Sequence, residues 1–286
     1  KEYLEGVKPV IELNPVKYYQ LTYENKKGGP VPQNDAGQFY MAYRSGDSDC
    51  ALPLAGVAGI KEEGGGTDAG SGGGGDTKEQ EPSENEKNKD AEPINGGFQS
   101  GTKKYLPGEA GVEIRNKSET MGLAVFSGDR FIKKLDSNDA NIYNILMCNI
   151  KNSKVSFYDG DDPNIPITMS LEEKRFPKIT IHRDTKTVDI ALKLEGELLS
   201  VPKKHQNSKD LDIKSADMIN KASEEFLNRI YEELGSDLLG IRGKLKWYFL
   251  SNKTYNDYVK DFNPKDWRFS VTSDLDIKRT GMTYYY

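Results

Sequence analysis

The 286-residue sequence predicts an α+β fold of several domains, with mainly antiparallel sheets, packed helices and a disordered linker rich in Gly and Glu. Three observations lead to this fold class. Short segments in which apolar and polar residues alternate recur along the chain, one long segment has helical periodicity, and a last alternating segment follows it. Because strands and helices do not alternate regularly, an α+β arrangement is favoured over a doubly wound parallel sheet.

Residues 1–60 are predicted to be the end or the remnant of an N-terminal domain, since they are few for an independent hydrophobic core. Segment 3–23 mixes helix-period apolar residues with two prolines. Segment 38–44 alternates apolar and polar side chains, which predicts a half-buried strand. Segment 51–60 is mostly apolar and is predicted to be a buried extended segment.

Residues 61–108 are predicted to form a flexible linker, and residues 61–93 its most disordered part. No Val, Ile, Leu, Met, Phe, Trp, Tyr or Cys occurs in residues 61–93, so too little apolar surface is present to offset the entropy of ordering them. These residues include ten acids and four lysines, a net charge of −6. Because the whole chain carries −5, the rest of the chain is nearly neutral.

Residues 109–166 are predicted to be a β-rich middle module. Its segments with the composition of strands are 112–114, 122–126 and 155–158. Turn residues at 127–130 predict a β-hairpin after the second of these. Segment 136–147 has apolar residues at helical spacing, which predicts a helix whose first turn is capped by Ser137 or Asn138.

Residues 167–286 are predicted to be a C-terminal α+β domain. Alternating apolar residues predict strands at 178–182, 188–194 and 269–277. Segment 215–234 carries an apolar stripe at steps of three and four and is followed by Gly235, which predicts an amphipathic helix packed on the sheet. A second short helix is expected within 237–249, with a polar stretch after it. The tyrosines at 284–286 fit an aromatic contact patch and an edge strand equally well.

Composition and cysteine spacing exclude several classes of protein. A pI near 5.4 argues against a general nucleic-acid binder. The two cysteines, Cys50 and Cys148, provide neither a disulfide framework nor the paired spacing of a zinc site. Cys148 lies in an apolar stretch and is interpreted as a buried, inert thiol. No apolar run approaches the roughly 18 residues of a membrane-spanning helix.

Few residues are candidates for catalysis, so we expect no enzyme, no cofactor and no metal. Neither His182 nor His205 lies near a nucleophile and an acid at a recognisable spacing, and both are interpreted as structural or solvated. The acidic turn at 158–163 lacks the further ligands of a calcium loop. The basic pairs at 203–204 and 278–279 are interpreted as solvated surface.

Several stretches, taken in order, resemble the Ger(x)C family. Segment 122–126 reads GLAVF and segment 129–132 reads DRFI, similar to the hairpin of that family. Segment 235–240 reads GSDLLG and resembles the family's DxxG turn, and the alternating segment 271–281 ends in KRTG. Residues 35–57 resemble the end of the family's N-terminal domain. The chain departs from the family pattern in lacking the aromatic residue after the DxxG turn and in its long linker.

The resemblance implies a non-enzymatic lipoprotein, the C subunit of a GerA-type spore germinant receptor. Such a subunit acts in receptor assembly and germination signalling beside GerA-type and GerB-type membrane-embedded subunits. It lies on the outer face of the spore inner membrane, held by an N-terminal lipid anchor absent from this chain. The residues expected to form a structural or interaction motif are Gly122, Phe126, Asp237, Gly240 and Gly281.

Two other functions stay open from the residues alone. A module that binds the small-molecule germinant directly requires a concave apolar pocket with a few convergent polar groups. A hydrolase is the least favoured alternative, because it requires His182 to be paired with both a nucleophile and an acid.

Overall fold

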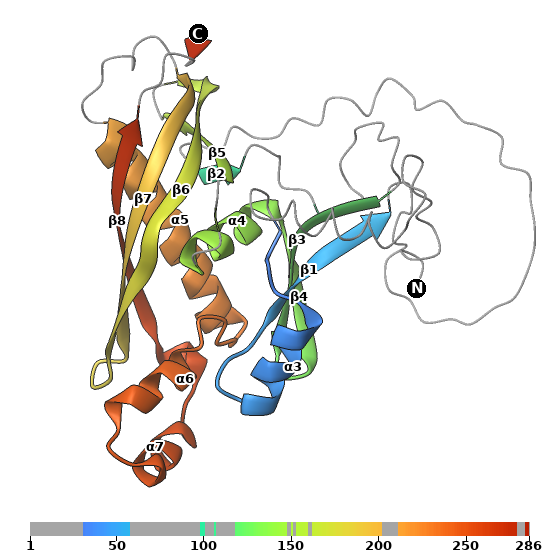
Figure 1. Ribbon diagram of the computed structural model, residues 1–286, viewed down its shortest axis with the longest axis vertical. Coiled ribbons are helices and arrows are strands. Elements are labelled where there is room, and N and C mark those ends of the chain that lie inside the picture. Colours follow the sequence, from blue (N-terminus) through green and yellow to red (C-terminus); the bar gives the residue numbers. More distant parts are fainter. Residues whose placement is uncertain are drawn as a thin grey trace, which may run out of the picture.

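Two β-sheets lie on either side of one buried helix (Figure 1). The computed structural model describes residues 31–57, 98–100, 106, 118–147, 150, 153–159, 162–201, 211–278 and 284–285. Outside these residues lie the segment 61–93, predicted to be the most disordered part of the linker, the segments at 3–23 and 112–114, and the single residues Cys148, His205 and Gly281. Within the linker expected at 61–108, residues 98–100 form a strand.

The smaller sheet is antiparallel and has the strand order β1-β3-β4. Its strands are β1 (Ala51–Val57), β3 (Ser118–Ser127) and β4 (Arg130–Leu135). β3 and β4 form the expected hairpin, and Gly128 in its turn has a φ of 59°. β1 pairs with β3 across a long stretch of sequence, with Ala51 opposite Val125. The extended backbone expected at 51–60 is therefore confirmed over 51–57, but of residues 51–55 only Ala51 is fully buried, so the expected burial is wrong for the rest of these.

The larger sheet is mixed, with the strand order β2-β5-β6-β7-β8 and β9 also paired to β7. Its strands are β2 (Phe98–Ser100), β5 (Ser153–Asp159), β6 (Asp162–His182), β7 (Thr187–Val201), β8 (Arg268–Lys278) and β9 (Tyr284–Tyr285). The pairs up to β6–β7 are antiparallel, whereas β8 and β9 run parallel to β7. The expected α+β class with mainly antiparallel sheets is confirmed, and the long helical crossover between β7 and β8 accounts for the parallel pair.

The expected division into domains stays a prediction. Position 166, where we placed the end of the middle module, lies inside β6. β6 pairs with β5 on one side and with β7 on the other.

Helix α5 (Leu211–Asn228) continues into a π-helical turn, η4 (Arg229–Glu233), and covers one face of the larger sheet (Figure 1). Its buried residues lie on one stripe, which includes Ile219 and Phe226. Gly235 follows in the left-handed conformation, with a φ of 64°. The amphipathic helix and its glycine stop are both as the sequence predicts.

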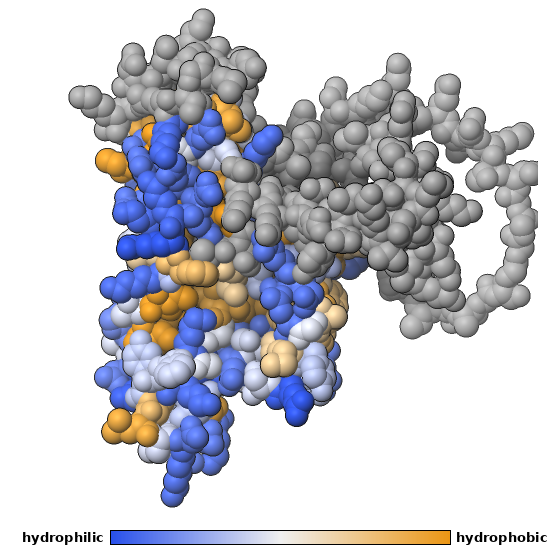
Figure 2. All heavy atoms as spheres, in the orientation of Figure 1, coloured by the Kyte–Doolittle hydropathy of each residue, from blue (hydrophilic) through white to orange (hydrophobic). Residues whose placement is uncertain are grey.

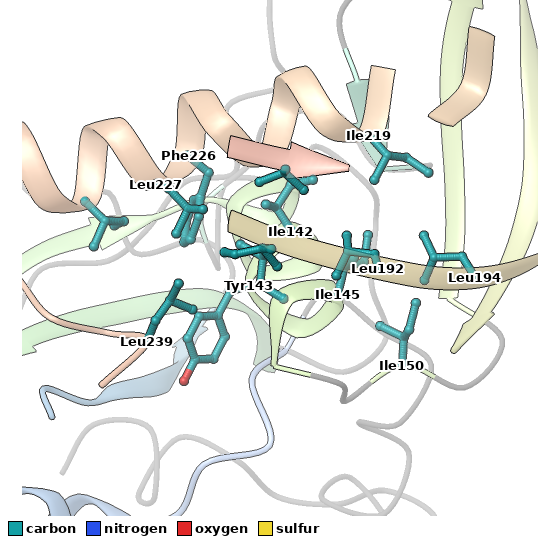
Figure 3. Packing of buried hydrophobic residues seen from close by; sticks show 14 of the residues in the cluster. Ile142, Tyr143, Ile145, Ile150, Leu192, Leu194, Ile219, Phe226, Leu227 and Leu239 are labelled. Carbon is teal, nitrogen blue, oxygen red and sulfur yellow. The ribbon is translucent and has the colours of Figure 1, made fainter. Parts of the chain in front are cut away.

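Helix α4 (Ser137–Leu146) is the centre of the core. Nearly all of its side chains are buried, and one continuous apolar cluster joins residues of both sheets, α4 and α5. Figure 3 shows Ile142 and Ile145 packed among residues of α5 and β7. The predicted helix is confirmed, but its N-cap is Asp136, whose carboxylate accepts hydrogen bonds from the backbone amides of Asn138 and Asp139.

Segment 38–44 is not a strand, as its alternation of apolar and polar residues predicted, but part of helix α3 (Ala36–Ser45). Asp35 and Gln38 form a reciprocal capping box at its start, and Gly46 ends it in the left-handed conformation. The helix has no fully buried residue, so no buried face imposed a helical period on its apolar side chains.

Short helices occupy the chain between α5 and β8. They are α6 (Ile241–Leu245), the 3-10 turn η5 (Lys246–Tyr248), α7 (Asn252–Val259) and the 3-10 turn η6 (Pro264–Asp266). α6 and η5 fall within the expected helix at 237–249, whereas α7 was not expected. α7 is only two turns long, and of its apolar face Tyr255 alone is fully buried, while Tyr258 and Val259 are partly buried against the core. Over the part of the chain that the structure describes, every helix is too short or too polar to cross a lipid bilayer.

Candidate functional site

The turn between α5 and α6, residues 236–240, is held by a buried carboxylate. Asp237 is 1% exposed, and its side chain accepts hydrogen bonds from the Tyr231 hydroxyl at 2.5 Å and from the amides of Ile241 and Arg242 at 2.7 and 2.8 Å. Burial raises the pKa of Asp237, and these donated hydrogen bonds offset part of that rise. The carboxylate thus joins the end of α5 to the start of α6.

Gly240 occupies a position in this turn that a side chain does not fit. Its φ is 65°, its amide donates to the Asp237 carbonyl at 3.1 Å, and a Cβ there would lie 3.0 Å from the Cβ of Ser48. The turn therefore approaches the segment before β1 closely, and glycine permits both the backbone conformation and the contact.

Asp49 connects this turn to the smaller sheet. Its carboxylate accepts a hydrogen bond from the Asp237 amide at 2.8 Å and another from the Gly128 amide at 2.9 Å. In return, the Asp49 amide donates to the Asp237 carbonyl at 3.0 Å. Three segments that are far apart in the sequence are thereby fixed to one another.

Phe126 lies at the same junction. Its carbonyl accepts a hydrogen bond from the Ser236 hydroxyl at 3.1 Å, and its amide donates to the Cys50 carbonyl at 3.0 Å. Its ring packs edge-on against Phe39 of α3, with ring centroids 5.0 Å apart. We refer to the contact set Asp49, Phe126, Gly128, Ser236 and Asp237 as the joint.

The structure brings three of the expected motif residues together, because Phe126, Asp237 and Gly240 lie at or beside the joint. Gly122 lies elsewhere on β3, with a φ of 76° and with the Leu135 carbonyl oxygen where a Cβ would be. Gly281 is outside the described residues. Asp237 and Gly240 are buried, so these two residues offer little surface to a partner.

A groove of about 410 Å³ adjoins the joint. α3, the segment before β1, the end of α4, the Asp237 turn and the start of α6 all contribute to its walls. The residues that line it are Asn34, Gln38, Ala42, Asp47, Ser48, Asp49, Cys50, Tyr143, Met147, Leu238, Leu239, Gly240, Gly243, Lys244 and Trp247.

Several polar groups converge on this groove. The Lys244 ammonium donates to the Leu239 carbonyl, and burial lowers its pKa. Asn34 donates to the Tyr143 hydroxyl at 2.7 Å, and Figure 3 shows this hydroxyl directed out of the apolar core. Burial raises the pKa of the Cys50 thiol to about 11, so the thiol stays protonated at neutral pH.

The catalytic alternatives gain no support from the described residues. His182 contacts the Asp189 carboxylate at 2.8 Å, and both side chains are about half exposed on the larger sheet. Within the described ranges, no three His, Cys, Asp or Glu side chains are grouped as metal ligands.

Sequence reasoning missed the residues that complete the joint and the groove. Asp49 lies 188 positions from Asp237, and no local pattern links the two. Tyr231 was read only as part of an amphipathic helix, although it supplies the donor at 2.5 Å. Lys244 sits in a short segment that looks like an ordinary basic surface helix.

Comparison with known proteins identifies the family of the larger part of the chain. Residues 121–281, more than half of the chain, match the family described as "Spore germination B3/ GerAC like, C-terminal". A solved structure, the crystal structure of the GerBC protein, shares 16% sequence identity with a TM-score of 0.43, and the match covers 56% of this chain. The chain spans about half of that protein, since the match covers 52% of it. No curated protein matches the chain.

Proposed function

The chain belongs to the spore germination B3/GerAC-like family, and from this membership we propose that it is a subunit of a spore germinant receptor. It acts without catalysis, in receptor assembly and germination signalling, beside GerA-type and GerB-type membrane-embedded subunits. Its place is the outer face of the spore inner membrane, where an N-terminal lipid anchor holds the full-length protein.

The joint is the observation that supports this proposal. Asp49 precedes the matched region, whereas Gly128 and Asp237 belong to it, and the three are linked by hydrogen bonds of 2.8–3.0 Å. A subunit that relays a signal between partners needs its parts fixed in one arrangement, and the joint provides such a fixed connection. The motif residues thus act through the geometry of the whole subunit.

Replacing Asp49 tests the proposal without opening the Asp237 site. In an Asp49→Ala variant of the full-length protein, the amides of Gly128 and Asp237 lose their shared acceptor, while the three bonds to the Asp237 carboxylate remain. We expect less of the membrane-embedded subunits to co-purify from spore membranes and germination to slow. Asp189→Ala, an exposed carboxylate on the larger sheet, is the matched control.

Two results contradict the proposal. If the unmodified protein brings down no membrane-embedded subunit from spore membranes, it is not a receptor subunit. If Asp49→Ala spores germinate and assemble receptors as the control does, the joint has no part in the function, although receptor membership survives.

The groove supports a second candidate function, direct binding of a small molecule. It combines apolar walls from Ala42, Met147 and Leu238 with the Lys244 ammonium and the Tyr143 hydroxyl, as ligand pockets do. Calorimetric titration with a panel of amino acids and sugars tests it. Saturable heat that is lost in Lys244→Ala and kept in Lys246→Ala, an exposed neighbour, supports binding in the groove. No saturable heat from any member leaves the receptor proposal without a sensing role for this subunit.

A further inference from the structure

Two large apolar side chains project from the turn that follows α6. Trp247 is 90% exposed and Leu250 is 108% exposed, more than any other large apolar side chain in the described residues. Figure 2 shows hydrophobic side chains at the surface of the lower end of the molecule, over α6 and α7, with hydrophilic ones around them. We call residues 246–250 the aromatic tip.

Tyr248 and Phe249 attach the aromatic tip to the rest of the fold. The Phe249 ring lies 5.2 Å from the ring of Tyr258, and the guanidinium of Arg183 sits 5.1 Å above it. The Tyr248 hydroxyl accepts a hydrogen bond from the Ile181 amide of β6 at 3.3 Å. The contacts of Tyr248 and Phe249 therefore fix the backbone from which Trp247 and Leu250 project.

The charged residues that lie near the aromatic tip in the sequence are all basic. Residues 241–256 contain Arg242, Lys244, Lys246 and Lys253 and no acidic residue. Of these, Lys246 and Lys253 are exposed on either side of Trp247 and Leu250. Acids from other parts of the fold also face this segment: Asp47 accepts a hydrogen bond from the Gly243 amide through its carbonyl at 2.9 Å, and Asp237 accepts one from the Arg242 amide at 2.8 Å. Nearer the tip, Asp184 pairs with Arg183 at 3.7 Å and Asp257 pairs with Lys260 at 2.8 Å.

We propose that the aromatic tip is a peripheral membrane-contact site that inserts Trp247 and Leu250 into the interface of an anionic lipid bilayer. Tryptophan is favoured where acyl chains meet head groups, and lysines beside it reach the lipid phosphates. Single protruding side chains suit a fluid lipid surface better than a protein, because a protein interface requires a broad complementary patch. The two exposed lysines are complementary in charge to anionic lipids. This inference goes beyond the proposed function and does not depend on it.

Vesicle binding of the chain tests this proposal. We expect sedimentation with vesicles of phosphatidylglycerol and phosphatidylcholine, and little with phosphatidylcholine alone. The chain has two tryptophans, and Trp267 is 1% exposed, so a blue shift of tryptophan emission on vesicle addition reports Trp247. High salt is expected to weaken the binding, because it screens the lysines.

Two variants distinguish binding through the aromatic tip from nonspecific binding of the chain to vesicles. A Trp247→Ser, Leu250→Ser double variant is expected to lose at least about tenfold in vesicle affinity, since it removes the apolar side chains that enter the interface. Phe176→Ser is the matched control, because Phe176 is 79% exposed on β6. An unchanged thermal unfolding curve for both variants shows that they are folded.

Three outcomes overturn the proposal. The first is that the unmodified chain fails to sediment with anionic vesicles. The second is that the double variant binds these vesicles as well as the Phe176→Ser variant does. The third is that the chain binds no vesicles but retains a protein from a membrane extract, and that this retention is lost when Trp247 is replaced. That result would assign the aromatic tip to a protein partner.

Discussion

Asp237 holds three hydrogen-bond donors at a place that water does not reach. An Asp237→Asn variant keeps one acceptor oxygen and puts an amide group where the other was, so at least one donor loses its partner. We expect the free energy of unfolding, measured by urea denaturation, to fall by about 3 kcal/mol. Asp189→Asn, on the exposed sheet face, should lower the free energy of unfolding by less than about 1 kcal/mol. Equal costs for the two variants would show that the buried site is not a stability determinant.

Gly122 provides a second contrast at the level of single residues. Its φ of 76° is unfavourable for a side chain, and the Leu135 carbonyl oxygen occupies the space that a Cβ needs. Gly128 has a φ of 59° with nothing within 4 Å of such a Cβ. We therefore expect Gly122→Ala to lower the free energy of unfolding by at least about 1 kcal/mol more than Gly128→Ala does. If the two substitutions lower it equally, backbone strain rather than the close contact sets the cost at Gly122.

At the level of elements, the open face of the larger sheet is crossed by a ladder of ion pairs. Lys174 of β6 contacts Glu195 of β7 at 3.1 Å and Asp276 of β8 at 2.8 Å, and Lys278 also contacts Glu195. Hydrogen bonds from Lys278 and Lys174 lower the pKa of Glu195, and a hydrogen bond from Lys174 lowers the pKa of Asp276. All of these groups are close to solvent, so each pair contributes modestly and is screened by salt.

The sign of the pH dependence of this ladder follows from the lowered carboxyl pKa values. A carboxylate whose pKa is lower in the folded state stabilises the fold above its ordinary pKa, and that contribution is lost as the pH falls through the lowered pKa. Lys174→Met should therefore lower the Tm at neutral pH and make little difference in strong acid. Lys133→Met, an exposed lysine on β4, should show no such pH-dependent difference. A Lys174 effect on the Tm that is equally large in acid would contradict the ladder.

Elements with a buried face could be predicted from the sequence, and elements without one could not. α4, α5 and β7 each have regularly spaced core residues, so their apolar pattern follows the period of the element. α3 buries no residue completely, and α7 is only two turns long, with Tyr255 buried beside the partly buried Tyr258 and Val259, so the apolar pattern of each is too weak to identify a helix. For α3 the signal was present in the chemistry of its ends, as Asp35, Gln38 and Gly46, and the alternating aromatic residues masked it.

The candidate site could likewise be predicted only in part, because its residues lie far apart in the sequence. The turn at 236–240 was identified from its own residues, because glycine and aspartate at that spacing form a recognisable local motif. Its partner Asp49 could not be found, since the hydrogen bond between the two depends on β1 pairing with β3. The groove beside the joint likewise combines residues from α3, α4 and α6, which meet only in the folded chain.

At the scale of the whole molecule, the segment at 31–57 is part of the same folded body as the matched region. β1 pairs with β3 along its length, Asn34 donates to the Tyr143 hydroxyl at 2.7 Å, and Asn144 donates to the Val31 carbonyl at 2.9 Å. The buried core also includes Ala51 of β1.

Cutting the chain tests this unity. With a protease site inserted within residues 61–93, we expect the two pieces to elute together from a sizing column after cleavage, because strand pairing, the joint and the core hold them. Denaturant should separate them, which serves as the control for complete cleavage. Separate elution in native buffer would show that the segment before residue 61 is only loosely attached.

The parallel pairing of β7 with β8 has a consequence for how the protein is made. β7 leaves the ribosome well before β8, because α5 and the short helices are synthesised between them. Until β8 arrives, one edge of the buried strand β7 has no neighbour, and such edges invite pairing with other nascent chains. Completion of the larger sheet is thus a late event in synthesis, and a ribosome that stalls before residue 268 leaves an aggregation-prone product.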